Sequence, residues 1–219
     1  MSKELVFTLD ELELDALTEL VNVGVSRAAS SLRTMVGSEV LLAVPRVEMM
    51  TYERAAKLIG ERESGELVAV HQSFNGEISG GAMLIFPEIN SLELVRAITG
   101  GGLPLEDIIA LEQEALAETG NIILNGCLAT IANMLERTLN ISLPEIIHGS
   151  GSEIFARSQL LEADTAVLFL YINFSVRDRD IHGYIAMLMD LPSLTALKAL
   201  IGRMIERAGG ESTPDHAAR

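Results

Sequence analysis

The chain contains an internal repeat with a fixed offset. Asn121 lies 99 positions after Asn22, and Pro144 lies 99 positions after Pro45. In each copy a Glu stands three residues before the Asn, and twenty-two residues separate the Asn from the Pro. Two copies of such a spacing are hard to produce by chance. The pattern therefore indicates a tandem duplication with two equivalent sites.

The duplication organises most of the chain. We assign repeat one to residues 10–100 and repeat two to residues 109–205, within a single domain spanning 1–219. The polar segment at 209–219 follows the last repeated position and is predicted to be a disordered tail. The glycines at 100–102 are predicted to form the joint between the two halves.

Hydrophobic periodicity gives each half the same order of elements: a long helix, a strand, a short helix, two strands and a helix. In the first half we expect helices at 10–37, 52–59 and 91–99, with strands at 39–50, 67–74 and 78–86. In the second half we expect helices at 105–139, 152–161 and 192–202, with strands at 141–147, 165–176 and 181–189.

Local signals refine these elements. Asn75 and Gly76 are predicted to form a hairpin turn. The second long helix is predicted to be interrupted near Asn125 and Gly126. Neither half has a sheet large enough to be independently stable. We therefore predict an α/β (α+β) fold in which both halves share one continuous, mostly antiparallel sheet about a pseudo-twofold axis, with the two long helices at the surface.

Composition excludes several classes of function. The chain has 219 residues and a formal net charge of -15, and its basic residues are scattered, so nucleic acid and anionic membranes are unlikely partners. The longest apolar run, from Ala166, is short and is broken by Asn173, which predicts no membrane span. The N-terminal segment lacks the pattern of a secretory signal. Cys127 cannot form an internal disulfide, so we expect a cytoplasmic protein.

Each long helix carries two carboxylates and a carboxamide at positions i, i+4 and i+7, which share one helical face. These residues are Asp15, Glu19 and Asn22 in the first half and Glu114, Glu118 and Asn121 in the second. Any surface helix of an acidic protein carries such residues, and a single copy would favour that interpretation. Asn, however, is a poor helix former. Its presence in both helices indicates a task for the side chain, which is either a hydrogen bond to a neighbouring loop or chemistry.

A Glu and an Asn can perform a specific kind of chemistry without a nucleophile. The carboxylate can bind a lysine of a partner, while the carboxamide donates and accepts hydrogen bonds without titrating and can hold a water for attack. This combination suits the hydrolysis of an activated phosphoryl group, for which positioning matters more than covalent catalysis.

The spaced motif resembles the signature of the CheC, CheX and FliY phosphatases: Asp or Ser, three residues, Glu, two residues, Asn, twenty-two residues and Pro. The first copy matches throughout, at Asp15, Glu19, Asn22 and Pro45. The second copy matches at Glu118, Asn121 and Pro144, with Glu114 in place of Asp or Ser. Two motifs in one chain look like the CheC type, since CheX carries one motif and FliY carries an added motor-switch domain that we expect this chain to lack.

The resemblance implies dephosphorylation of a CheY-like response regulator. Glu19 or Glu118 would pair with the regulator's lysine, and Asn22 or Asn121 would orient the attacking water. Asp15, Glu114, Pro45 and Pro144 would support the motifs. The Mg²⁺ ion would be the regulator's own, so no cofactor or metal of this chain is expected.

The family often has Gly before the motif Asn. Gly120 keeps that small residue in the second copy, whereas Val21 occupies the position in the first. A bulky residue there could crowd a docking partner, so this difference favours the second copy as the stronger centre.

Another kind of function remains open. The chain could instead be a non-catalytic module that binds a receiver domain or a CheD-like receptor deamidase, and a motor-switch role is a weaker third hypothesis. The histidines at 71, 148, 182 and 216 lack metal-ligand spacing and are given no role. Cys127 is expected to be a packed thiol.

Overall fold

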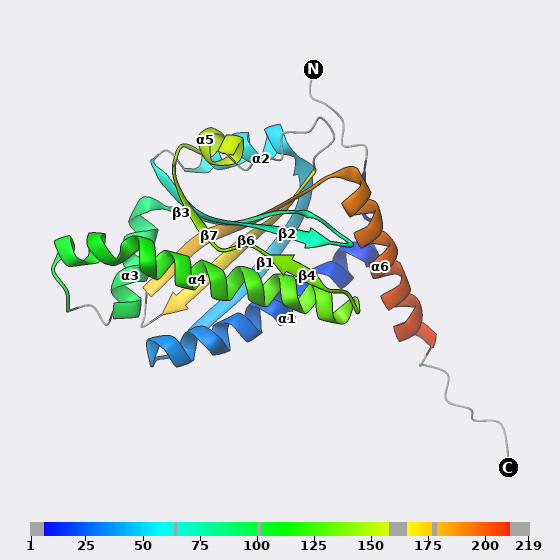
Figure 1. Ribbon diagram of the computed structural model, residues 1–219, viewed down its shortest axis with the longest axis horizontal. Coiled ribbons are helices and arrows are strands. Elements are labelled where there is room, and N and C mark those ends of the chain that lie inside the picture. The colour runs from blue at the N-terminus through cyan, green and yellow to red at the C-terminus, as the bar shows by residue number, and fades with distance from the viewer. Residues whose placement is uncertain (1–6, 64, 100–101, 158–165, 177–178, 211–219) are drawn as a thin grey trace, which may run out of the picture.

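The computed structural model describes residues 7–63, 65–99, 102–157, 166–176 and 179–210. The predicted tail lies outside the described residues from 211 onward, as do positions 100 and 101 of the predicted joint and the end of the predicted helix at 152–161. The described residues form one α/β domain (Figure 1).

A seven-stranded antiparallel sheet runs through the domain in the order β1-β6-β7-β3-β2-β4, and β5 also pairs with β2. The strands are β1 (Val40–Thr51), β2 (Leu67–Gly76), β3 (Gly80–Pro87), β4 (Leu139–Ile141), β5 (Glu145–Gly149), β6 (Ala166–Val176) and β7 (Arg179–Met189). The hairpins β2–β3 and β6–β7 meet at the centre of the sheet, where β3 pairs with β7.

The two halves exchange their first strands. Strand β1 of the first half pairs with β6 of the second, while β4 and β5 of the second half pair with β2 of the first. From either edge inward, the order is the first strand of one half followed by the two hairpin strands of the other half. The order is the same from both edges, as a pseudo-twofold axis requires. The predicted continuous sheet is confirmed, and each half depends on the other for a complete set of strand neighbours.

Helices cover both faces of the sheet (Figure 1). One face carries α1 (Glu11–Val36), α3 (Glu88–Thr99), α4 (Leu105–Met134) and α6 (Leu191–Gly210), and the other carries α2 (Tyr52–Arg62) and α5 (Gly151–Arg157). Side chains of β2 alternate between the two cores: Val68 and Val70 face the first group of helices, and Leu67 and Ala69 face the second. Both faces of the central strands are therefore buried.

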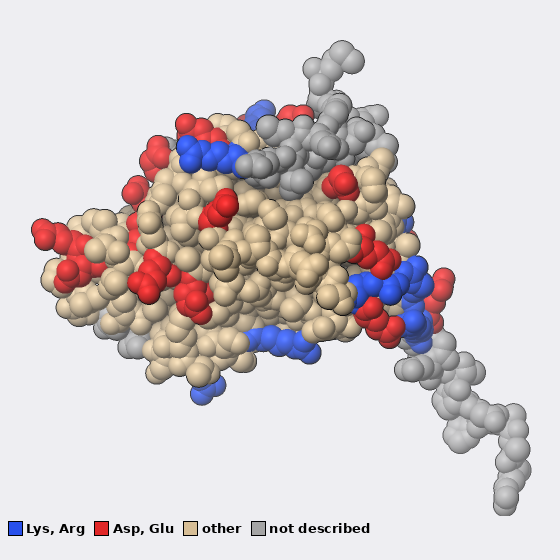
Figure 2. All heavy atoms as spheres, viewed as in Figure 1, with Lys and Arg blue, Asp and Glu red and all other residues tan. Residues whose placement is uncertain are grey.

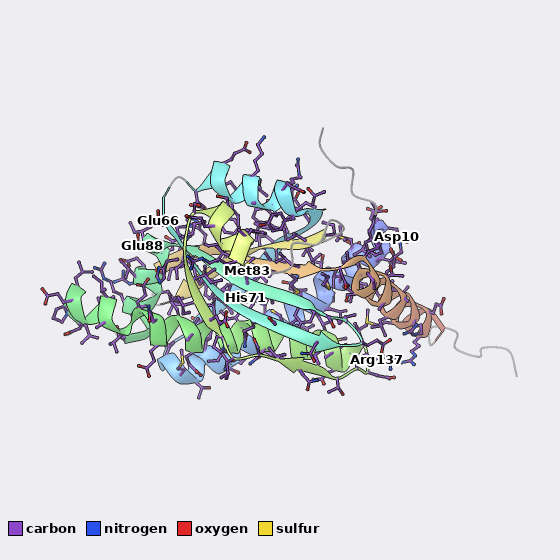
Figure 3. The ribbon with its side chains drawn as sticks, turned by 45° about the horizontal axis from the view of Figure 1, so that its top comes forward. Asp10, Glu66, His71, Met83, Glu88 and Arg137 are labelled. Carbon is purple, nitrogen blue, oxygen red and sulfur yellow. The ribbon has the colours of Figure 1, made fainter. Side chains whose placement is uncertain are left out.

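The first long helix begins and ends as its sequence predicts. Asp10 and Glu13 form a capping box, in which each side chain accepts a hydrogen bond from the other residue's backbone N–H at 2.8 Å. Gly37 ends the helix in the left-handed conformation, with φ of 66°. Figure 3 places Asp10 at the end of the molecule beside α6.

Equivalent buried carboxylates tie each long helix to the last helix of a half. Glu13 lies 3.1 Å from Lys198 Nζ of α6, and Glu112 accepts a hydrogen bond of 2.6 Å from Ser91 Oγ of α3. Glu112 lies 99 positions after Glu13. The repeat therefore extends to the way in which its helices pack.

The predicted interruption of the second long helix is wrong. Helix α4 runs without a break through Asn125 and Gly126, and it ends at Met134 rather than at 139. A Cβ on Gly24 of α1 would lie 2.8 Å from Cys127 Cα and 2.9 Å from the Gly126 carbonyl oxygen. The glycines mark the place where the two long helices touch, not a break in either helix.

One turn and one strand also differ from prediction. Asn75 and Gly76 remain in strand β2, because they pair with Asn140 and Leu139 of β4, and the turn falls at 77–79. The strand predicted at 141–147 divides into β4 and β5, with Pro144 between them. A long-range strand partner thus overrode the local turn signal at Asn75.

Helix α4 is long and apolar enough to cross a membrane by length and composition alone, which the prediction of no membrane span overlooked. In the fold, 56% of its most apolar window is buried against the rest of the protein. That burial matches the core helix of a globular domain.

The contact between α1 and α4 can be tested with glycine substitutions. Gly24→Ala should destabilise the fold by about 1–3 kcal/mol, because the added methyl meets backbone atoms that cannot rotate away. Gly202→Ala in α6 is the matched control, since its Cβ would meet nothing within 4 Å, and it should stabilise by about 0.5–1 kcal/mol. Urea unfolding measures both changes, and an equal response at the two positions would contradict the proposed contact.

Candidate functional site

The motif of the first half lies along the solvent side of α1. Asp15 and Glu19 are exposed, while Asn22 is half-buried. The opposite face of the helix, with Leu17 and Val21 both 0% exposed, packs on the sheet. The predicted stripe is therefore present, with its carboxylates in solvent and its amide at the boundary with the protein.

Asn22 and Pro45 are linked through the strand that follows the helix. The Asn22 Oδ1 atom accepts a hydrogen bond of 3.3 Å from the backbone N–H of Val44. The pairing of β1 with β6 shifts register between Ala43 and Arg46, and Pro45 has no N–H to donate. The Val44 N–H is thus free to bond the helix. This contact gives the spacing between Asn and Pro a structural reason.

The second motif occupies the equivalent place on α4. Glu114 and Glu118 are exposed and Asn121 is half-buried, as in the first half. Pro144 again lies where the strand pairing is broken, between β4 and β5. All eight residues predicted from the sequence therefore fall into two separate groups, one on each long helix and the strand region that follows it.

The amide of Asn121 is held differently from that of Asn22. Its Oδ1 atom accepts hydrogen bonds from Gln72 Nε2 at 3.2 Å and from Asn125 Nδ2 at 2.8 Å. Gln72 Nε2 also donates to the Ser142 carbonyl oxygen at 2.9 Å. In both motifs, then, the amide oxygen is engaged by the protein, and the amino group has no partner among the described residues.

The motif glutamates are available to a partner. Glu19 and Glu118 are exposed, and neither makes a hydrogen bond or an ion pair with another residue in the described part of the chain. Some other glutamates are engaged within the protein: Glu93 pairs with Arg96 and Arg179, and Glu48 pairs with Arg46. The motif carboxylates could each accept a cation from another molecule without breaking an internal contact.

A pocket of about 340 Å³ adjoins Asn121 between the two long helices. It is lined by Arg27, Ala28 and Ser31 of α1 and by Asn121, Ile122, Asn125 and Gly126 of α4. Arg27 also donates to Thr130 Oγ1 at 3.5 Å. The first half therefore contributes a cation beside the second motif.

The sequence-based preference for the second motif, which rests on Val21 and Gly120, is not supported by the structure. Val21 is fully buried and cannot crowd a docking partner. A Cβ on Gly120 would lie 2.5 Å from Val70 Cγ1, so this glycine allows α4 to approach strand β2. The difference between the halves concerns packing of helix on sheet, and it gives no preference for the second motif.

The remaining reactive side chains are structural or peripheral. Cys127 is fully buried, and burial raises the pKa of its thiol to about 12, which disfavours a nucleophilic thiolate. His71 is also buried, and it lies beside Met83 of strand β3 (Figure 3). Among the described residues, no cluster of three or more His, Cys, Asp or Glu side chains could hold a metal ion.

Three residues near the second motif were not assigned to the site from the sequence: Gln72, Arg27 and Asn125, the last of which was interpreted only as a helix interruption. Gln72 had a detectable signal, because it is a polar residue in the apolar row Val68, Val70 and Phe74 of one strand face. Asn125 also had one, because it stands four residues after Asn121 on the same helix. Arg27 had none, since its position depends on how α1 crosses α4.

These features define a class: an internally duplicated α/β domain that presents a Glu and an Asn from each of two long helices to solvent. No family model matches the chain. It is 19% identical to the CheY-P phosphatase CheC of Bacillus subtilis over 89% of this chain and 96% of that protein. It is 25% identical to a CheC1 protein of Halobacterium salinarum over 67% of this chain and 74% of that protein.

Solved structures share the fold. Thermotoga maritima FliY superposes with a TM-score of 0.70 at 17% identity, covering 90% of this chain and 100% of that one. The middle domain of FliM from H. pylori superposes with a TM-score of 0.56 at 11% identity, covering 88% and 99%. Together with the spaced motifs, the similarity to these two CheC proteins supports a CheC-type family for the chain, and the fold is the one found in FliY.

Substitution of the motif glutamates should leave the fold intact. Glu19→Gln and Glu118→Gln should each change the free energy of unfolding by less than about 0.5 kcal/mol, because neither side chain has a partner in the described structure. Glu112→Ala is the control on the same helix as Glu118, and it should cost about 1–3 kcal/mol, because it removes a buried side chain together with its hydrogen bond to Ser91. Chemical denaturation tests both, and a large cost at Glu118 would mean that the carboxylate supports the fold.

Proposed function

We propose that this protein hydrolyses the aspartyl phosphate of a CheY-like response regulator. Sequence similarity supports this reaction, because one relative is named a CheY-P phosphatase. The single observation that carries the proposal is the state of the two motifs. In each, an exposed glutamate has no partner in the described structure, and an amide is anchored through its oxygen.

The glutamates would orient the regulator. Glu19 or Glu118 would form an ion pair with the lysine of the receiver domain beside its phosphorylated aspartate. An exposed ion pair contributes little affinity, so its main effect would be to fix the register of the long helix against the receiver. Asp15 and Glu114, one turn earlier on the same stripes, would extend this contact.

The amides would position water. With the oxygen of Asn22 or Asn121 occupied, the amino group is left to donate to a water at the exposed side of the helix. Attack of that water on phosphorus breaks the bond to the aspartate oxygen, releasing phosphate and restoring the carboxylate. Positioning supplies most of the catalysis in such a reaction.

Charge neutralisation would come from the regulator. This chain has a net charge of -15, and Figure 2 shows acidic side chains gathered at the end of the molecule where α4 begins. A phosphoryl group would be repelled from such a surface unless it arrived with a bound cation. We therefore assign the Mg²⁺ ion to the acidic pocket of the regulator, with no ligand from this chain.

A non-catalytic adaptor is the second candidate function. The fold is shared with the middle domain of FliM, which is found in a complex with FliG. Binding of a receiver domain without faster loss of phosphate would select this alternative. Binding of a CheD-like receptor deamidase stays a prediction that a pull-down with purified CheD can test.

The reaction can be tested with a phosphorylated receiver domain in Mg²⁺. The wild-type protein should shorten the lifetime of the phosphate, and Asn22→Ala and Asn121→Ala should each remove part of the acceleration, by an amount that reports the share of each centre. Glu19→Gln and Glu118→Gln should lower the maximal acceleration more than they raise the half-saturating receiver concentration, because the ion pair fixes the register of the docked helix and adds little affinity. Undiminished acceleration in both single-Asn variants and in both Glu variants would contradict the assigned roles.

A further inference from the structure

Gln72 occupies a position where the fold has no need of a polar group. It is 0% exposed and stands in β2 among the apolar side chains that face α4. The equivalent residue of the other half is Ile172 in β6, because Phe74 pairs with Ile141 as Phe174 pairs with Leu42. Ile172 is also 0% exposed. An apolar residue therefore satisfies the packing at the equivalent position of the second half.

The amide of Gln72 has one possible orientation. Its Nε2 atom lies 2.9 Å from the Ser142 carbonyl oxygen, which can only accept, so the amino group must face Ser142. The same amino group donates to Asn121 Oδ1 at 3.2 Å. Gln72 thus fixes which atom of Asn121 points into the protein.

The arrangement disfavours folding. Gln72 Oε1 is buried without a hydrogen-bond partner among the described residues, and so is Asn125 Oδ1. A buried acceptor without a partner destabilises the folded state. Polar side chains that remain under such a cost are found where function requires them.

Asn125 completes the hold on Asn121. Its Nδ2 atom donates to Asn121 Oδ1 at 2.8 Å, from one helical turn further along α4. The equivalent residue of the first half is Ser26, which is exposed. Rotation of the Asn121 amide would break both hydrogen bonds at once, so its unpartnered amino group is held in a single orientation.

We infer that Gln72 is a positioning residue for the second centre, which fixes the Asn121 amide so that its amino group is presented for water. The inference rests on the proposed function for its kinetic consequence. The two centres therefore hold their amides in different ways. A backbone N–H donates to the Asn22 amide oxygen, whereas two side-chain amides donate to the Asn121 amide oxygen.

The kinetic test isolates the second centre in an Asn22→Ala background and adds Gln72→Ile, which installs the residue found in the other half. We expect kcat for phosphate release to fall roughly tenfold to a hundredfold with KM nearly unchanged, because docking is intact and only the amide is misplaced. The midpoint of thermal unfolding should stay equal or rise, since the unpartnered oxygen is removed. Ile172→Val in the same background is the control and should leave kcat unaltered. An unchanged kcat in Gln72→Ile overturns the inference.

A second readout does not require activity. In the otherwise wild-type protein, NMR relaxation of the side-chain amino groups should show Asn121 losing order in Gln72→Ile, while Asn22 keeps its own. If wild-type protein fails to accelerate dephosphorylation, the proposed function is wrong, yet this measurement still decides whether Gln72 positions Asn121. Equal order of Asn121 in the two proteins overturns the positioning role.

Discussion

The exchange of first strands between the halves is the constraint on which the rest of the structure depends. Because β1 pairs with β6, and β4 and β5 pair with β2, each edge of the sheet combines both repeats. Helix α4 therefore lies over β2 and β3 of the first half as well as over β4 and β5 of its own. This arrangement brings Gln72 of the first half to Asn121 of the second. A single half would lack a closed core, and the second motif would lack its contact with Gln72.

The motif couples structure and chemistry in one residue. Asn22 satisfies a backbone N–H that the break at Pro45 leaves outside the strand pairing, which explains why a proline at a fixed distance belongs to the pattern. In the second half the corresponding strand is divided into β4 and β5. Two side-chain amides, in place of a backbone N–H, donate to the Asn121 oxygen. Both halves therefore keep the exposed carboxylates and the half-buried amide, but different groups hold the amide in each half. The two centres can thus share a reaction and differ in rate.

The sequence was sufficient to predict the repeat, the sheet shared by both halves and the exposed stripes, because these follow from periodicity and spacing. It was insufficient wherever distant segments meet. Gly126 and Gly120 looked like a break and a docking feature, but they are contact points with α1 and with Val70. Asn75 looked like a turn until its partner strand was known. Arg27 comes to lie beside Asn121 only through the crossing of the two long helices.

The central claim is that the motif amides act on chemistry and not on binding. The most direct measurement compares the wild-type protein with the double variant Asn22→Ala, Asn121→Ala at receiver concentrations that saturate both, with affinity determined separately by calorimetry on a receiver carrying a stable phosphoryl analogue. The account predicts that the double variant binds with an affinity within about threefold of wild type, while the phosphate lifetime returns to that of the receiver alone. A double variant that binds and still accelerates hydrolysis as the wild type does would contradict it.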